Sequence, residues 1–264
     1  MIVTSSKDTF IKFWDLKNGH CFKTLTGHVT EVWSFALAKN DSYLVSGSND
    51  SELRVWKIYD KQVSSPQVEK DDIEYFGPLE CSKLGSILRQ GLGRVSSLSV
   101  DHSTQVLCCH GNEKLVELFH FVSADEAAKR YHRRLKKLRK KQDQSGEETT
   151  VTASPADSLT YHISRLAPVK THHRVKSSIV SFEETSQKIK VVISTNSNTV
   201  EIHSVELANK KESQLERIIT GPGHNSDARC IAFDESDNTT MVSGSVNDLK
   251  VWNRPLSRCI RTIE

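Results

Sequence analysis

The chain has 264 residues, with 36 basic and 33 acidic side chains that leave a net charge of +3 at neutral pH. No run of about 18 apolar residues occurs, so the sequence excludes a helical membrane span. Its six cysteines form no C-x-x-C pair and no G-x-x-x-x-G-K motif is present, so we expect no metal, cofactor, nucleotide or small-molecule substrate. These features predict an intracellular protein without membrane contact.

The first part of the chain repeats one pattern. Trp14 and Trp56 lie 42 residues apart, in the strings SSKDTFIKFWDLKNG and SGSNDSELRVWKIYD. The pair Gly27-His28 precedes Trp56, and the His is 28 residues before it. The segments VTEVWSFAL, SYLVSGS and ELRVWKI read as short alternating strands bounded by turn residues. A spacing of this length indicates a structural repeat built from several strands.

The third unit follows by register, although it lacks the signature residues. Its expected strands are RVSSLSVD, QVLCCHG and KLVELFHF, with Phe119 at the tryptophan position. Before it, the polar stretch 61–72 predicts a flexible loop, because it contains little apolar surface to bury.

A strongly basic segment follows the third unit. Residues 129–141 hold nine Lys or Arg and no acid, and without these nine the chain would carry 27 bases against 33 acids. Ser123 as an N-cap, with Asp125 and Glu126 in the first turn, predicts a helix over residues 124–142. One narrow face of this helix can dock through apolar residues at helical spacing. These residues are Ala128, Tyr131, Leu135 and Leu138.

The dense positive charge of the helix favours a polyanionic partner. We predict RNA contact through Lys129, Arg130, Arg133, Arg134, Lys136, Lys137, Arg139, Lys140 and Lys141. A nuclear import signal and a docking site for an acidic protein are the alternatives. The polar stretch 142–157 that follows predicts a second flexible loop.

Two more units complete the chain. The fourth has the strands SSIVSFEE, KVVISTN and TVEIHSV, with His203 at the tryptophan position. The fifth has ARCIAF, TMVSGS and LKVW, and its Gly223-His224 pair again stands 28 residues before Trp252, counted from the His. The expected outer strands are CFKTL, SILRQG, YHISRLA, LERIIT and CIRTIE.

The GH-to-Trp spacing, the SGS-x-D turn and the short outer strand CFKTL resemble the WD-repeat family, whose unit is one blade of a β-propeller. The resemblance implies an all-β fold of about four complete blades and one partial blade, with one inserted basic helix. The expected units are residues 1–25, 29–92, 94–171, 177–221 and 228–264. Since this number does not close the family's usual ring, we expect a fragment of a larger propeller.

The resemblance also implies a structural role for the recurring Ser, His, Asp and Trp residues. In the family, the His of the GH pair, a turn Asp, a strand Ser and the Trp form a buried hydrogen-bond network rather than a hydrolytic triad. The matching residues are Asp8, Trp14, His28, Ser46 or Ser48, Asp50, Trp56, His224 and Trp252. Loss of His28 is expected to destabilise the fold by about 1 to 3 kcal/mol.

The segment YFGPLECSKLGSILRQGLGRVSSLSVDHSTQVLCCHGNEKLVELFHF resembles WD-repeat subunits of the small-subunit processome. That resemblance implies a non-enzymatic scaffold in the nucleus and nucleolus, where other processome WD-repeat proteins and small nucleolar RNA or pre-ribosomal RNA are its partners. The alternative is a WD-repeat substrate receptor or adaptor of a ubiquitin ligase, in which the basic segment serves only for import.

Overall fold

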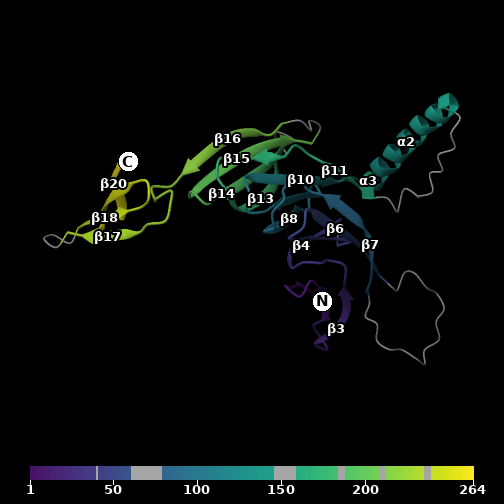
Figure 1. The fold of residues 1–264 in the computed structure, drawn as a ribbon, viewed down its shortest axis with the longest axis horizontal. Coiled ribbons are helices and arrows are strands. Elements are labelled where there is room, and N and C mark those ends of the chain that lie inside the picture. The colour runs from purple at the N-terminus through teal and green to yellow at the C-terminus, as the bar shows by residue number, and fades with distance from the viewer. Residues whose placement is uncertain (40, 61–78, 146–158, 184–187, 208–211, 235–238) are drawn as a thin grey trace.

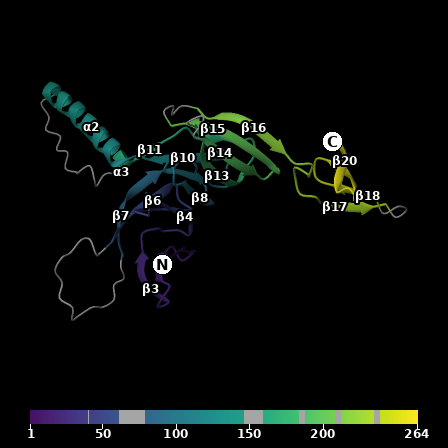
Figure 2. The ribbon, with the colours of Figure 1, turned by 180° about the vertical axis from the view of Figure 1, so that it is seen from behind.

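The computed structural model describes residues 1–39, 41–60, 79–145, 159–183, 188–207, 212–234 and 239–264. They form five antiparallel sheets that follow one another in chain order, with one long helix inserted in the third (Figure 1). The two chain ends lie in different sheets that are far apart in both ribbon views (Figure 2).

The first three sheets contain strands β1 to β12. The first sheet is β1 (Ile2–Ser5), β2 (Ile11–Asp15) and β3 (His20–Leu25). The second is β4 (Val32–Ala38), β5 (Tyr43–Ser48), β6 (Glu52–Asp60) and β7 (Leu79–Leu88). The third is β8 (Ser97–Asp101), β9 (Val106–His110), β10 (Leu115–Phe121), β11 (Ile163–Arg165) and β12 (Val169–Lys170).

The last two sheets are regular four-stranded meanders. The fourth is β13 (Val175–Glu183), β14 (Lys188–Thr195), β15 (Thr199–Glu206) and β16 (Gln214–Thr220). The fifth is β17 (Cys230–Phe233), β18 (Thr240–Gly244), β19 (Leu249–Asn253) and β20 (Arg258–Ile263). The fourth sheet begins two residues before the predicted unit boundary at residue 177.

A β-bulge recurs at the tryptophan position of four sheets. The pairing with the outer strand shifts between Phe13 and Trp14, Val55 and Trp56, Ile202 and His203, and Val251 and Trp252. A bulge inserts one extra residue into a strand and increases the local twist. Because each of these strands has its bulge at one position, the bulge identifies equivalent residues in different sheets. His203 is therefore the structural equivalent of the tryptophans.

The third sheet is packed on both faces, as strand alternation predicts. Along β9, Val106 and Cys108 join the core shared with the fourth sheet. Leu107 and Cys109 join the core shared with the second sheet. Since successive side chains of a strand point to opposite faces, one short strand contributes to two cores.

A third core connects the first two sheets. It combines Ile11, Phe13 and Leu25 of the first sheet with Leu44 and Trp56 of the second. The three cores explain why each internal strand is rich in apolar residues on both of its faces.

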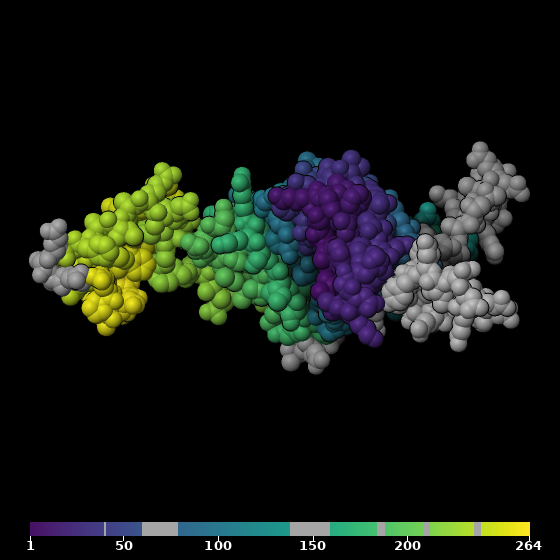
Figure 3. Space-filling view, turned by 90° about the horizontal axis from the view of Figure 1, so that it is seen from below, coloured from purple at the N-terminus to yellow at the C-terminus, as the bar shows by residue number. Residues whose placement is uncertain are grey.

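The fifth sheet is set apart from the other four in the space-filling view (Figure 3). Ile231 and Phe233 of β17 are 59% and 54% exposed, and every residue of β16 on the fourth sheet is exposed as well. Among the described residues, the outer strand of the fourth sheet and the inner strand of the fifth sheet are therefore open to solvent.

The basic segment forms the helix α2 (Ala124–Ser145), which projects from the third sheet (Figures 1 and 2). Ser123 Oγ accepts a hydrogen bond from the Glu126 backbone N–H at 3.3 Å, as expected of an N-cap. The helix is three residues longer than predicted, so the prediction of a flexible loop from residue 142 is wrong for 142–145. The rest of that loop, and the predicted loop 61–72, lie outside the described residues.

The base of α2 docks through a small apolar cluster. Val122 and Ala127 are buried together with Tyr161 of the short helix α3 (Leu159–His162), and Tyr131 packs against them. The rings of Tyr131 and Tyr161 meet edge to face, with centroids 5.4 Å apart. Ala127 takes the buried position for which we expected Ala128, because Ala127 is the residue that packs with Tyr161.

Two outer strands differ from the prediction. In the third sheet, the predicted strand YHISRLA begins within α3 and continues as the short strand β11, and β12 begins two residues after the predicted strand ends. In the second sheet, β7 ends at Leu88, so the last three residues of the predicted strand SILRQG lie in the connection to the third sheet. The first difference occurs next to the inserted helix α2, and the second occurs in the connection between the second and third sheets.

The docking of α2 can be tested with Tyr131→Ala. Loss of the edge-to-face pair and its burial is expected to weaken local protection by about 1 to 2 kcal/mol, while the sheets stay folded. Hydrogen exchange of residues 124–137 measures this change directly. Arg133→Ala, on the exposed side of the same helix, is the control, and equal effects of both changes would contradict the docking role.

Candidate functional site

A buried polar network lies in the second sheet. The Ser46 hydroxyl lies 2.7 Å from His28 Nε2 and accepts the Trp56 indole N–H at 3.0 Å. His28 Nδ1 faces the Asp50 carboxylate at 4.0 Å. Burial, reinforced by the Arg54 guanidinium, lowers the pKa of His28 to about 4. The imidazole is therefore neutral at physiological pH and can accept the Ser46 hydroxyl proton.

Ser48 does not belong to this network. Its hydroxyl lies 2.5 Å from Thr30 Oγ1 and donates to the Glu31 carbonyl at 2.8 Å. Of the two serines that the sequence left open, Ser46 is the one next to His28 and Trp56. Gly47 stands between them because an added Cβ would lie 2.6 Å from Val95 Cγ1, in the connection that leads to β8.

The fifth sheet contains a tighter version of the same network. His224 lies 2.6 Å from Ser243 Oγ through Nε2 and 2.6 Å from Asp248 Oδ1 through Nδ1. Trp252 donates its indole N–H to Ser243 at 2.7 Å. Hydrogen bonds from Ser245 and then His224 lower the pKa of Asp248.

Sequence reasoning left Asp248 and Ser243 out of the candidate residues. The turn of the fifth unit is one residue shorter than in the second and its Asp stands one residue later in the turn, so Asp248 stands four residues before the tryptophan instead of six. Ser243 opens the second SGS string as Ser46 opens the first, and that shared string was the available signal.

In the first sheet the two predicted residues are not brought together. Trp14 donates to Thr4 Oγ1 at 2.8 Å, and Thr4 takes the place that Ser46 has in the second sheet. Asp8 instead accepts the Phe10 backbone N–H at 3.1 Å and pairs with Lys12 at 3.2 Å. Asp8 therefore stabilises its own turn.

The third sheet uses a buried glutamate where the tryptophan network is absent. Glu117 is 3% exposed and stands two residues before Phe119. Its carboxylate accepts the backbone N–H groups of Gln90 and Gly91 at 2.9 and 3.1 Å, and Arg89 Nε lies 3.7 Å away. The loop held in this way corresponds to the loop that carries the GH pair in the second unit.

Glu201 repeats this arrangement in the fourth sheet. It is 1% exposed and stands two residues before His203, which it contacts at 2.9 Å. The backbone N–H of His172, in the preceding loop, bonds to the same carboxylate at 3.1 Å. These hydrogen bonds lower the pKa of Glu201 despite its burial. Sequence reasoning missed both glutamates, although each is an acid within an otherwise apolar strand.

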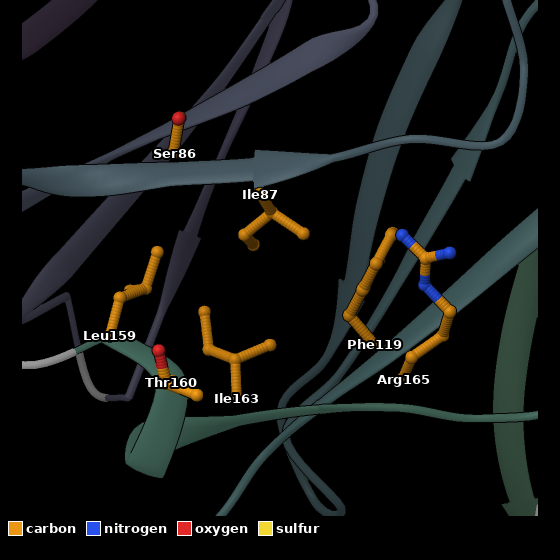
Figure 4. A pocket seen from close by; sticks show the side chains of 7 residues that line it. All are labelled: Ser86, Ile87, Phe119, Leu159, Thr160, Ile163 and Arg165. Carbon is orange, nitrogen blue, oxygen red and sulfur yellow. The ribbon is translucent and has the colours of Figure 1, made fainter.

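The pocket in Figure 4 lies between the second and third sheets and has a volume of about 210 Å³. Ile87, Leu159, Ile163 and Phe119 supply its apolar surface. The guanidinium of Arg165 lies 5.5 Å from the centre of the Phe119 ring and bonds to the Leu88 carbonyl. The lining contains no pair of acid and base that could carry out a proton transfer.

The basic side chains of α2 are displayed to solvent. Lys129, Arg133, Lys136 and Lys137 are exposed, and Arg130 is half-buried. Arg134 is exposed as well, but its guanidinium lies 5.9 Å from the centre of the Tyr161 ring at the base of the helix. The side chains of Arg139, Lys140 and Lys141 lie outside the described part of the helix.

Within the described residues, no group of three or more His, Cys, Asp or Glu is arranged to hold a metal ion. None of the helices described is long and apolar enough to span a membrane. His172 and His173, which follow Lys170 in a basic stretch, are both exposed, and His172 contacts Glu201.

The second sheet decides the family. Residues 19–57 match the family model described as WD domain, G-beta repeat. The match covers the GH pair, the SGS turn and Trp56, which form the network described above. The chain is built of WD-repeat blades. The predicted all-β fold of about four complete WD-repeat blades, one partial blade and one inserted helix is confirmed.

Curated relatives extend the similarity beyond a single WD repeat. WD repeat-containing protein 3 of Mus musculus is 36% identical over 193 residues, and that of Homo sapiens is 35% identical over 190 residues. Each alignment covers 70% of this chain and 20% of the relative. U3 small nucleolar RNA-associated protein 12 of Saccharomyces cerevisiae is 26% identical over 271 residues, which cover all of this chain and 27% of the relative. The chain thus spans about a fifth to a quarter of the length of these relatives.

The His28 network makes stability depend on pH. The folded-state pKa of about 4 lies below the ordinary value of 6.5, so the unfolded chain binds the proton first as the pH falls. The contribution of His28 is full above pH 6.5 and is lost progressively toward pH 4. Between about pH 7 and pH 5 this loss amounts to about 2 kcal/mol.

Urea unfolding of the wild type and His28→Gln at both pH values tests this dependence. The variant should be less stable at pH 7 by about 1 to 3 kcal/mol, and its stability should decline less on acidification. The exposed His102→Gln is the control. A variant with the same pH slope as the wild type would show that His28 is not the titrating group.

Glu117→Gln tests the glutamate of the third sheet. The change places an amide NH₂ against backbone N–H donors and leaves Arg89 without a charge partner, so we expect a destabilisation of about 2 to 3 kcal/mol. Chemical unfolding measures it, with the exposed Glu212→Gln as a control. A loss below about 0.5 kcal/mol, typical of surface changes, would contradict the proposed role.

Proposed function

We propose that this chain is part of a non-enzymatic scaffold subunit of the small-subunit processome, and that helix α2 contacts RNA. The observation that carries the proposal is a cationic helix displayed from WD-repeat blades, in a chain similar to a relative named for association with U3 small nucleolar RNA. The proposed location is the nucleolus. The proposed role is in pre-ribosomal RNA processing and assembly of the small ribosomal subunit.

The charge and exposure of α2 support RNA contact. The exposed Lys129, Arg133, Lys136 and Lys137 make no ion pair with an acid among the described residues. At 22 residues the helix is about 33 Å long. It can therefore contact several phosphates of one strand, each contact releasing bound counterions.

The blades support the scaffold part of the proposal. The networks of His28 and His224 are buried and hydrogen-bonded within their own blades, so they offer no accessible nucleophile to a substrate. In the proposed assembly, other WD-repeat subunits of the processome contact the blades, while α2 contacts pre-ribosomal RNA or the small nucleolar RNA.

A five-fold variant tests the RNA contact. Lys129, Arg130, Arg133, Lys136 and Lys137 are changed together to Gln, while Arg134 is kept because it packs on Tyr161. RNA affinity is measured across a salt series by fluorescence anisotropy with a single-stranded pre-ribosomal RNA fragment. If each side chain contacts a phosphate, the slope of log affinity against log salt should fall by up to about 3.5, at roughly 0.7 per contact.

The matched control removes five exposed cations from elsewhere in the chain. These are Lys17, Lys83, Arg217, Arg229 and Arg258, all changed to Gln. The control variant has the same net charge as the test variant, so a purely global charge effect would lower both slopes equally. That result, or unchanged binding by the α2 variant, would reduce the helix to an import signal or a protein-docking element.

A further inference from the structure

Two exposed apolar residues occupy the same place in successive blades. Val29 is 83% exposed and Leu92 is 82% exposed. Val29 stands 27 residues before Trp56, and Leu92 stands 27 residues before Phe119. Each lies in the connection from the outer strand of one blade to the inner strand of the next. Exposed apolar side chains at repeated positions of adjoining blades can contribute to a shared contact surface when other binding groups lie beside them.

An aromatic residue with two cations lies beside these loops. Trp33, near the start of β4, has Arg94 with its guanidinium carbon 4.5 Å from the ring centre and Lys7 with its Nζ at 5.2 Å. Both cations are exposed, and neither pairs with an acid in the described part of the chain. Their interaction with the ring is electrostatic and leaves their positive charge available to a ligand.

Hydrogen bonds hold these loops in place. The Val32 backbone N–H donates to the Ser6 carbonyl at 3.1 Å, which joins the first blade to the second. The Val95 N–H donates to the Ser48 carbonyl at 3.0 Å, which joins the second blade to the third. Gly93, between Leu92 and Arg94, donates to Glu113 at 2.6 Å. The surface is therefore preorganised across three blades, which lowers the entropic cost of binding.

We propose that Lys7, Val29, Trp33, Leu92 and Arg94 form a docking surface for an acidic segment of a partner protein that carries aliphatic side chains. We call these five residues the loop surface. Val29 and Leu92 would contact the aliphatic side chains, and Lys7 and Arg94 would pair with carboxylates. Glu31 and Glu113 are the acids of the same loops, and Glu113 is engaged by Gly93.

The geometry favours a peptide over RNA. A nucleobase needs an open aromatic face for stacking, but Lys7 and Arg94 already lie against the Trp33 ring. Val29 and Leu92 provide apolar contacts that a phosphate backbone does not use. The loop surface is also separate in sequence from α2, so its test is independent of the RNA contact proposed above.

The test uses the 264-residue chain with 5-fluorotryptophan at its four tryptophans. The probe is a short fluorescein-labelled peptide in which Asp and Leu alternate. We expect it to shift the fluorine signal of Trp33, assigned with Trp33→Phe, and to leave the other three signals unchanged. Val29→Ser with Leu92→Ser should weaken binding roughly tenfold or more. Lys7→Gln with Arg94→Gln should weaken it and reduce its salt dependence.

Leu256→Ser with Lys17→Gln is the matched control, since Leu256 is 72% exposed and Lys17 is exposed in the first unit. Thermal unfolding confirms that each variant is folded. Peptides with Ser for Leu or Asn for Asp should bind weakly. The proposal is overturned if the Asp-Leu peptide does not bind, if the control variant loses as much affinity as the loop variants, or if oligouridylate shifts the Trp33 signal instead of the peptide.

Discussion

The burial of sheet faces between successive blades is the interaction on which the rest of this structure depends. A single twisted sheet of four short strands has two apolar faces and cannot cover either of them alone. The third sheet shows the solution most clearly, because alternate residues of β9 enter two different cores. This packing holds the connecting loops and the inserted helix in defined places, so both proposed contact surfaces depend on it.

Two kinds of buried polar interaction hold the loops against these sheets. In the second and fifth blades a buried histidine, a serine and a tryptophan share hydrogen bonds. In the third and fourth blades a buried glutamate, two residues before the tryptophan position, binds backbone N–H groups of the preceding loop. Both satisfy buried polar groups that would otherwise destabilise the fold. The third and fourth blades therefore still hold their preceding loops through buried hydrogen bonds, although they lack the signature residues.

In helix α2, the side chains that pack against the blade differ from the basic side chains that are proposed to bind RNA. Of the helix side chains that the structure describes, Ala127 and Tyr131 in the first turns pack against α3, whereas Lys129, Arg133, Lys136 and Lys137 are exposed to solvent. The loop surface around Trp33 combines apolar and cationic side chains on a framework of hydrogen bonds. Different chemistry at the two places fits a scaffold that binds RNA through one element and protein through another, as proposed.

The sequence by itself determined the repeat, the tryptophan positions and the basic helix, because strand alternation, turn residues and helix caps are local signals. The tertiary structure decided the choice of Ser46 over Ser48, the inclusion of Asp248, and the buried roles of Glu117 and Glu201. It also decided that Ala127 rather than Ala128 faces α3. Each of these depends on atoms from segments distant in the chain, so local pattern cannot resolve them; only the packing of neighbouring strands and blades brings the partners within hydrogen-bond distance.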